Sequence, residues 1–258
     1  MKRFMMVIVF LLTGVFGMNA QDAASIVDAA RNRITSATTS TRSRMVITAK
    51  NGSTTERLID QYSKDDAQGN ARTVIVFQQP ANVKGTRFLT MDNASGGSDR
   101  WIYLSSLGKV RRIAASESGG SFMGTDFSYD DISALSRDTK LDTHTLLREE
   151  TLNGAPCYVI QSVPKDGSYQ YSKTISWIDK NKLLLYKSEL YDRRSALIKV
   201  MESSEYKDIQ GRLTAMQTKV STIAAGTSTT IYMEIVKYDD PIPEAVFTTA
   251  YLETGRSR

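Results

Sequence analysis

The chain has 258 residues, 41% of them hydrophobic, and a formal net charge of +5. This composition is ordinary for a globular protein and allows a sizeable core, and a chain of this length can be one domain if it is all β. The basic residues are spread along the chain in runs of at most two, so the charge predicts no nucleic-acid partner.

The N-terminus is typical of a secretory signal peptide. Two basic residues precede an apolar run over residues 4–16, and the small residues Gly17 and Ala20 follow. The run is shorter than the ~20 apolar residues that a membrane span needs. We therefore predict that residues 1–20 are a leader, cleaved after Ala20 or after Gly17, and that residues 21–258 form a single exported domain.

The remaining chain reads as one amphipathic helix followed by many short strands. Asp22 can cap a helix over residues 22–35, and the apolar period then changes from helical to two. Asn-Gly pairs at residues 51–52 and 153–154 are strong hairpin signals, and no crossover helix separates the later segments. The pattern predicts a mainly β protein with a single antiparallel sheet of about eleven strands.

A sheet of that size must curl or split, because open sheets twist. Only two amphipathic helical segments are available to cover it, at residues 22–35 and 128–135. This is too little cover for so long a sheet. Either the sheet closes into a barrel or something else occupies its concave side, and this deficit favours a lipid site.

The most distinctive part of the sequence is the block over residues 80–131. It contains in order KGTRFL (84–89), WIYL (101–104), KVRRI (109–113) and SFMGTDFSYDDI (121–132). These four pieces resemble the outer-membrane lipoprotein-sorting proteins, the periplasmic LolA-like carriers. More narrowly, they are similar to a longer subgroup that is linked to lipid export, and the likeness extends more weakly to IPEAVFTTAYLE near the C-terminus.

The resemblance implies an incomplete β-barrel whose concave apolar face is covered by a few helices and receives acyl chains of lipoproteins or lipids. It also implies a periplasmic location, an inner-membrane exporter and an outer-membrane acceptor as partners, and transient membrane contact. In LolA-like carriers an arginine locks the lid helix. Arg44, Arg72 and Arg87 are the alternatives here.

The candidate ligand-binding residues are of two kinds. Large apolar side chains are expected to line or cover the cavity, although each taken singly is typical of a protein core: Phe88, Trp101, Tyr103, Phe122, Met123, Phe127, Tyr129 and Met233. Charged side chains are expected to tether the cover or to bind a headgroup: Arg87, Arg111, Arg112, Asp126 and Asp131. The two adjacent arginines can pair with a ligand anion or with Asp126 and Asp130. The acidic cluster favours helix capping near Ser128 over metal binding.

Residues 121–135 are predicted to be a movable cover over the concave face. Phe122, Met123 and Phe127 would insert into the apolar cavity when no cargo is present, and neighbouring glycines would supply hinge freedom. The alternative is a fixed loop that completes the core.

No catalytic centre, metal site or cofactor is predicted. His144 and Cys157 are single residues in strand patterns, and no G-x-S-x-G motif is present. Two other function classes stay open at this point. One is a secreted lipid-modifying hydrolase, and the other is an envelope scaffold domain that binds partners through an exposed edge strand.

Overall fold

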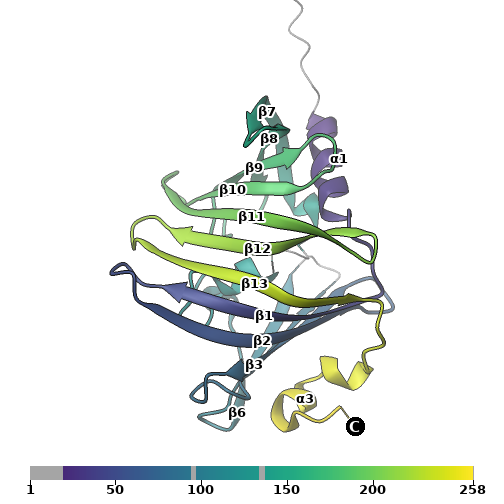
Figure 1. Ribbon diagram of the computed structural model, residues 1–258, viewed down its shortest axis with the longest axis vertical. Helices are drawn as coiled ribbons and strands as arrows, with labels where there is room; N and C mark the ends of the chain where they lie inside the picture. The colour runs from purple at the N-terminus through teal and green to yellow at the C-terminus, as the bar shows by residue number, and fades with distance from the viewer. Residues whose placement is uncertain (1–19, 94–96, 134–136, 258) are drawn as a thin grey trace, which may run out of the picture.

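The structure, a computed structural model, describes residues 20–93, 97–133 and 137–257. One curved antiparallel sheet forms its body (Figure 1). The predicted leader over residues 1–20 and its cleavage sites lie outside the described residues, apart from Ala20, where the first helix begins. Within the described part of the chain, no helix has the length and apolar character needed to cross a membrane.

The sheet contains thirteen strands. Their bounds are β1 Thr38–Thr48, β2 Thr54–Asp65, β3 Ala71–Gln79, β4 Arg87–Asp92, β5 Ser98–Leu104, β6 Lys109–Arg112, β7 Asp142–Leu152, β8 Ala155–Pro164, β9 Lys173–Asp179, β10 Leu185–Tyr191, β11 Leu197–Ile209, β12 Arg212–Thr222 and β13 Thr227–Tyr238. The helices are α1 Ala20–Arg31, α2 Tyr129–Ser133 and α3 Thr249–Thr254, with short 3₁₀ turns η1 Ala115–Glu117, η2 Thr139–Leu141 and η3 Glu244–Phe247.

Two meanders make up the sheet, and the first and last strands join them. Strands β1–β6 and β7–β13 each pair in sequence order, and β1 pairs with β13 through ten register partners from Thr39–Tyr238 to Thr48–Ser228. Strands β6 and β7 are the two edges and do not pair with one another. The sheet therefore curves without closing, as in an incomplete barrel.

The predicted fold class is confirmed, but the predicted count of about eleven strands is too low. The short strands β4 and β6 are full members of the sheet, and all four residues of β6 have register partners on β5. The Asn153–Gly154 hairpin forms as expected, with φ of 51° and 83° at its two residues. Positive φ at both positions matches the right-handed twist of the flanking strands.

The helices are shorter than predicted. Helix α1 ends at Arg31 instead of residue 35, because the next residues are held by β12: the Thr35 carbonyl accepts a hydrogen bond from Arg212 Nε at 3.0 Å. Helix α2 covers Tyr129–Ser133, and the last two residues of the predicted 128–135 segment lie outside the described residues.

Both faces of the sheet carry apolar cover. Because side chains alternate along a strand, Ile75 and Phe77 face the concave core while Val74 and Val76 face the convex side. The segment with η3 and α3 packs on that convex patch, and α1 packs on β7–β9 at the other end of the sheet (Figure 1). The concave face of β1–β5 is covered by the chain between β6 and β7.

Candidate functional site

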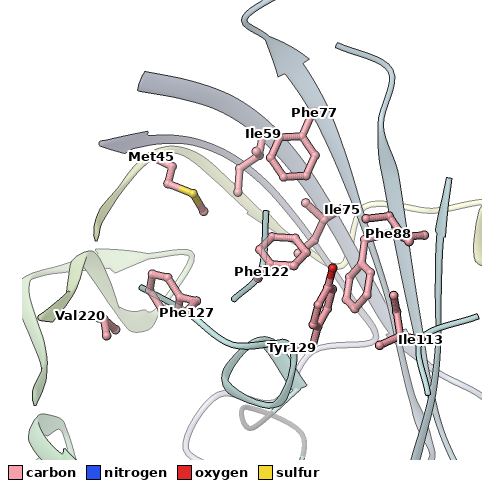
Figure 2. Packing of buried hydrophobic residues seen from close by; sticks show 11 residues of the cluster. Met45, Ile59, Ile75, Phe77, Phe88, Ile113, Phe122, Phe127, Tyr129 and Val220 are labelled. Carbon is pink, nitrogen blue, oxygen red and sulfur yellow. The ribbon is translucent and has the colours of Figure 1, made fainter. Parts of the chain in front are cut away.

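The connection between the two edge strands passes inside the curve of the sheet. β6 ends at Arg112 and β7 begins at Asp142, and these strands lie at opposite edges. The connection must therefore cross the open side. Residues 118–133, called the inner segment below, pack against the concave face (Figure 2).

Three aromatic side chains of the inner segment fill the apolar part of this face. Phe122, Phe127 and Tyr129 are all buried. The ring of Phe122 lies 5.2 Å from Phe88 and 5.7 Å from Tyr129, both in edge-to-face geometry. Their other neighbours come from β1, β2, β3, β5 and β12: Met45, Ile59, Ile75, Phe77, Ile102 and Val220. These rings complete the apolar core on the concave side of β1–β5.

A tight turn carries Phe122 into this core. The N–H of Phe122 donates to the carbonyl of Phe127 at 2.7 Å, and the Thr125 hydroxyl donates to the carbonyl of Phe122 at 2.7 Å. Met123 and Gly124 have φ of 52° and 75°. This left-handed conformation costs glycine little, which explains Gly124 at the apex.

The helix α2 that follows begins with a reciprocal capping box. The Ser128 hydroxyl accepts from the N–H of Asp131 at 3.0 Å, and the Asp131 carboxylate accepts from the N–H of Ser128 at 2.7 Å. Gln170 donates to the same hydroxyl at 2.7 Å. The interpretation of the acidic cluster as helix capping near Ser128 is confirmed for Asp131.

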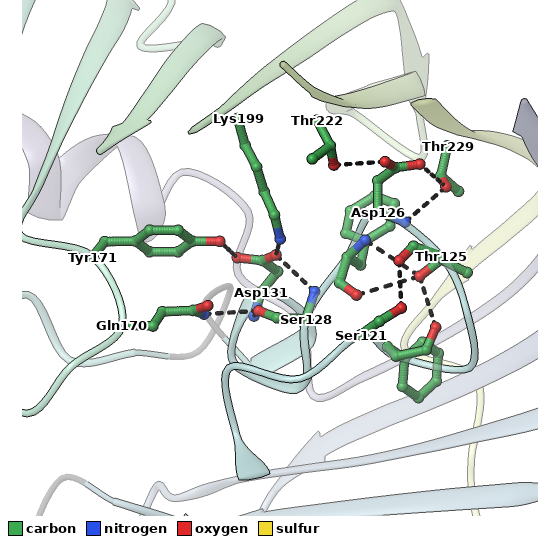
Figure 3. A network of polar contacts seen from close by, with 12 residues as sticks. Ser121, Thr125, Asp126, Ser128, Asp131, Gln170, Tyr171, Lys199, Thr222 and Thr229 are labelled. Atoms are coloured by element: carbon green, nitrogen blue, oxygen red, sulfur yellow. Dashed lines mark hydrogen bonds and ion pairs between the residues drawn. The ribbon is translucent and has the colours of Figure 1, made fainter. Parts of the chain in front are cut away.

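Asp131 also joins the inner segment to β11, on the second meander of the sheet. Its carboxylate accepts from the Tyr171 hydroxyl at 2.7 Å and forms an ion pair with Lys199 Nζ of β11 at 2.8 Å (Figure 3). The Asp131 side chain is only 2% exposed. Burial and the nearby carboxylate raise the pKa of Tyr171, so its hydroxyl stays protonated and remains a donor.

Asp130 joins the inner segment to β5, on the first meander of the sheet. It forms an ion pair with Arg100 of β5 at 2.9 Å, and both side chains are about nine-tenths buried. The Ser118 hydroxyl donates to the same carboxylate at 3.0 Å. Two consecutive carboxylates of α2 therefore neutralise two cations that approach from different strands.

Asp126 is a third anchor and is bound by hydroxyl groups. Its carboxylate accepts hydrogen bonds from Thr222 at 2.6 Å and Thr229 at 2.7 Å, and Thr227 also donates to it. The backbone N–H of Asp126 donates back to the Thr229 hydroxyl at 3.0 Å (Figure 3). These contacts fix the turn to β12 and β13.

Arg57 of β2 holds the apex of the turn. Its guanidinium donates to the carbonyl of Met123 and lies 5.7 Å from the centre of the Phe77 ring. Desolvation lowers the pKa of Arg57.

The three acidic side chains thus bind three different sets of partners and do not converge. Among the described residues, no group of three or more His, Cys, Asp or Glu side chains is placed to hold a metal ion.

The structure brings most of the predicted apolar residues to one place. Phe88, Phe122, Phe127 and Tyr129 belong to the concave core, and Met123 packs against it. Met233 of β13 also lies on this side, where its sulfur accepts from the buried Ser43 hydroxyl at 3.0 Å.

Trp101 and Tyr103 are placed elsewhere, so their assignment to the cavity is wrong, and Arg87, which was predicted to tether the cover or to bind a headgroup, lies beside them. Trp101 and Tyr103 alternate with the inward-facing Ile102 and therefore lie on the convex face, under the C-terminal segment. The Arg87 guanidinium stacks on Tyr103 at 5.2 Å and donates to the carbonyl of Leu252 at 2.8 Å.

Of the two alternatives for Arg111 and Arg112, the pairing with Asp126 and Asp130 is wrong. Arg111 binds Glu117, and Arg112 binds Asp99, both near the β6 edge and well exposed to solvent. The carboxylates of Asp126 and Asp130 are instead satisfied by the threonines and by the buried Arg100.

None of the three candidates for a locking arginine contacts the inner segment in the described structure. Arg44 pairs with Glu56 and Glu234, Arg72 pairs with Asp66 and Glu244, and Arg87 lies under the C-terminal segment. Three basic side chains that do hold the inner segment are Arg57, Arg100 and Lys199.

Sequence reasoning missed these three residues, although a signal for two of them was available. Arg100 alternates with the core residue Ile102, and Lys199 alternates with Met201, which packs against the same core. A charged side chain at an inward-facing strand position needs a buried partner of opposite charge. This requirement identifies Arg100 and Lys199 as candidates for buried ion pairs.

The single histidine and cysteine are held in structural roles. His144 Nε2 donates to the carbonyl of Thr139 at 2.9 Å, so Nδ1 accepts from the Ser162 hydroxyl at 2.8 Å. In a Ser-His-Asp catalytic triad a carboxylate accepts from the second ring nitrogen of the histidine, whereas here the acceptor is the backbone carbonyl of Thr139. Cys157 is fully buried on the convex side, and burial raises the pKa of its thiol.

Two hollows are present at the periphery of the described structure. One of about 340 Å³ lies between β1, β2 and the C-terminal segment, where Tyr62 and Tyr251 line it. The other, of about 420 Å³, lies at the β5–β6 edge, and its lining includes Arg100, Arg112 and Ile113.

Three solved structures share this fold over most of the chain. A DUF1329 family protein from Desulfovibrio piger is 30% identical, with a TM-score of 0.86 over 90% of this chain and 98% of its own. An outer membrane lipoprotein-sorting protein domain from Vibrio parahaemolyticus is 26% identical, with a TM-score of 0.85 over 91% and 100%. A LolA superfamily protein from Nitrosomonas europaea is 20% identical, with a TM-score of 0.72 over 89% and 98%.

The open sheet with its covered concave face is thus a LolA-like fold. A family model described as "Uncharacterized protein" matches residues 69–254, and no curated protein matches the sequence. Within this fold class, the chain belongs to the DUF1329 family.

Proposed function

We propose that this protein is a non-catalytic periplasmic carrier that binds the acyl chains of lipoproteins or lipids on the concave face of its sheet and moves them toward the outer membrane. The inner segment occupies that face in the unloaded state and leaves it when cargo enters. Cargo would come from an inner-membrane exporter and pass to an outer-membrane acceptor, with transient membrane contact on the way.

The observation that carries the proposal is the way in which the concave core is completed. Its sheet side is a continuous apolar surface from β1 to β5, and its other side is formed by Phe122, Phe127 and Tyr129 of a connecting segment. The hydrogen bonds of the turn close within the segment, and its remaining anchors are side chains. Removing the segment breaks no strand pairing within the thirteen-stranded sheet.

The energies of the two occupants are of similar size. Burying three large side chains contributes roughly 5–9 kcal/mol at about 1.5–3 kcal/mol each. A sixteen-carbon acyl chain contributes about 12 kcal/mol at ~0.8 kcal/mol per buried CH₂. The difference of roughly 3–7 kcal/mol in favour of the acyl chain is available to offset the loss of the polar anchors when the inner segment leaves.

The relatives add support for this class of cargo. The Vibrio parahaemolyticus structure that covers 91% of this chain is described as an outer membrane lipoprotein-sorting protein domain. The N-terminal sequence, with its basic start and short apolar run, is typical of export.

The proposal includes no catalytic step. The only histidine of the chain, His144, has both ring nitrogens engaged, and its ring is buried. Esterase or phospholipase activity that co-purifies with the protein and is lost in His144→Ala or Ser162→Ala would contradict this part of the proposal.

The direct test is a fluorescent fatty acid titrated into wild type and into the double variant Phe122→Ala/Phe127→Ala. The variant should be less stable, because buried aromatic rings are lost. It should nevertheless bind the probe more tightly, since the segment that competes for the site is weakened. In parallel, mass spectrometry of protein purified from its own envelope should detect a co-purifying acyl species.

The matched control is Phe247→Ala, which removes an equally buried phenyl ring from the convex face. It should lower stability without changing affinity for the probe. If the double variant folds and binds the probe no more tightly than wild type, the inner segment is a fixed part of the core and the carrier mechanism fails.

A further inference from the structure

We propose that the cargo is an anionic amphiphile, whose charged group takes the place of Asp130 at Arg100, while the buried Lys199, which loses Asp131, adds a second positive charge that favours an anion. This inference rests on the proposed carrier function and names its class of ligand. An acyl chain with a carboxylate or phosphate group has the required chemistry.

The inner segment itself has the layout of such a ligand. Its apolar part, ending at Tyr129, fills the concave core, and the next two residues present carboxylates to buried cations. Asp130 binds Arg100 at 2.9 Å, and Asp131 binds Lys199 at 2.8 Å. An apolar body followed directly by negative charge is the arrangement of a fatty acid or a lipid phosphate.

The cations stay behind when the segment leaves, because they belong to the sheet. Arg100 lies on β5 and Lys199 on β11, and the two side chains are only 11% and 14% exposed. A neutral ligand would leave both charges in the interior without the carboxylates that now balance them. A buried charge that loses its partner is strongly unfavourable, whereas an incoming anion restores the pairing.

A further donor lies beside Arg100. The Thr90 side chain on β4 is paired in register with Arg100 and shares the inward face with Phe88. Thr90 is 4% exposed, and its hydroxyl has no hydrogen-bond partner among the described residues. A buried hydroxyl normally has a partner, and a ligand oxygen bound to Arg100 would supply one.

Space for a headgroup exists at the same place. The hollow of about 420 Å³ at the β5–β6 edge borders Arg100 and opens to solvent beside Arg112. The half-buried Asp99 also lies there and is paired with Arg112. With Asp130 withdrawn, Arg100 would face this hollow from within. The headgroup would then sit at the sheet edge and the chain in the core.

The test compares three probes that share one chain: hexadecanoate, hexadecyl phosphate and hexadecanol. Each displaces a fluorescent fatty acid from the wild-type protein at pH 7.5 in a competition titration, and inorganic phosphate is tested alone. The two anionic probes should bind about tenfold to a hundredfold more tightly than the alcohol, as expected for hydrogen bonds to a charged group. Inorganic phosphate should not compete.

Neutralised pairs test whether the two cations cause the preference. The variants Arg100→Gln/Asp130→Asn and Lys199→Gln/Asp131→Asn remove both charges of each pair and leave polar side chains that can still donate and accept hydrogen bonds. Each should reduce the preference for the anionic probes severalfold while hexadecanol still binds. Lys187→Gln/Glu189→Gln, an ion pair elsewhere on the sheet, is the matched control and should leave the preference unchanged.

The outcomes separate this inference from the proposed function. Equal affinity for the acid, the phosphate and the alcohol overturns the inference and leaves the carrier standing. Binding of none of them overturns both. If both neutralised pairs still prefer the anionic probes to hexadecanol, Arg100 and Lys199 are not the cause of the preference and the assignment of the site is overturned. Competition by inorganic phosphate alone overturns it as well. The wild-type comparison needs no variant, so it decides even where a substituted pair fails to fold.

Discussion

The hold of the inner segment on the sheet can be weakened at one residue, Asp126. Its carboxylate accepts hydrogen bonds from Thr222, Thr227 and Thr229, at 2.6 and 2.7 Å for the first and third. In Asp126→Asn the side chain keeps one acceptor oxygen, so one or two charge-assisted hydrogen bonds are lost. At about 1.5–3 kcal/mol for each bond to a charged group, the loss of one bond destabilises the closed state by roughly 1.5–3 kcal/mol.

In a carrier whose inner segment competes with ligand, that loss lowers the free-energy difference between the closed and the open state by the same amount. Every 1.4 kcal/mol is about tenfold in affinity, so a fluorescent fatty acid should bind Asp126→Asn roughly 10–100-fold more tightly. Denaturant unfolding in the same buffer should give the lower stability directly. The assay is a probe titration of wild type and variant under identical conditions.

Asp179→Asn is the matched control for Asp126→Asn. Asp179 is as buried as Asp126 and also accepts several hydrogen bonds, from the N–H groups of Asn181 and Lys182 and from the Tyr186 hydroxyl, but it lies at the end of β9, away from the inner segment. Its substitution should lower stability without changing affinity. Equal loss of stability in both variants, with unchanged affinity in Asp126→Asn, would refute the reasoning, because the segment would then be a fixed part of the core.

Three further predictions concern stability and reactivity. Deleting residues 241–258 should expose the convex apolar patch and produce binding of a hydrophobic dye, because the C-terminal segment packs there; a deletion variant that stays monomeric and binds no dye would contradict this packing. Asp66, whose pKa is lowered from 3.8 to about 2, mainly by the N–H of Asn70, should stabilise the fold above pH 3.8 and lose this contribution as the pH falls through about 2. Acid-unfolding curves of wild type and Asp66→Asn should therefore differ most above pH 3.8 and converge at lower pH; parallel curves would argue against it. Cys157 should not react with a thiol reagent until denaturant unfolds the protein, since its side chain is buried and its pKa is raised.

Much of the fold was predictable because the sheet is a meander with local signals. The Asn153–Gly154 pair fixed one hairpin, and period-two alternation located the strands on both sides of it. The pairing of β1 with β13 had no local signal, because its partners lie far apart in the sequence. The end of α1 was missed for the same reason: residues after Arg31 are held by Arg212 of β12.

Only the local contacts of the site could be predicted from the sequence, and the contacts between residues far apart in the chain could not. The capping box of Ser128 and Asp131 is local and could be anticipated, as could the apolar character of Phe122 and its neighbours. The threonine partners of Asp126 lie 96 to 103 residues further along the chain, so no spacing rule connects them. Trp101 was misplaced because both faces of β5 are apolar, and alternation alone does not tell which face is concave.

The central claim is that the inner segment and an acyl chain exclude one another from the concave face. Hydrogen–deuterium exchange of residues 118–133, with and without hexadecanoate, tests it most directly. The N–H groups of Phe122 and Tyr129 are hydrogen-bonded inside the segment, at 2.7 and 3.1 Å, and are protected in the closed state. We predict that ligand accelerates exchange of these amides while the amides of β3 and β4 stay protected or become slower. Unchanged or slower exchange throughout the inner segment at saturating ligand would contradict the account.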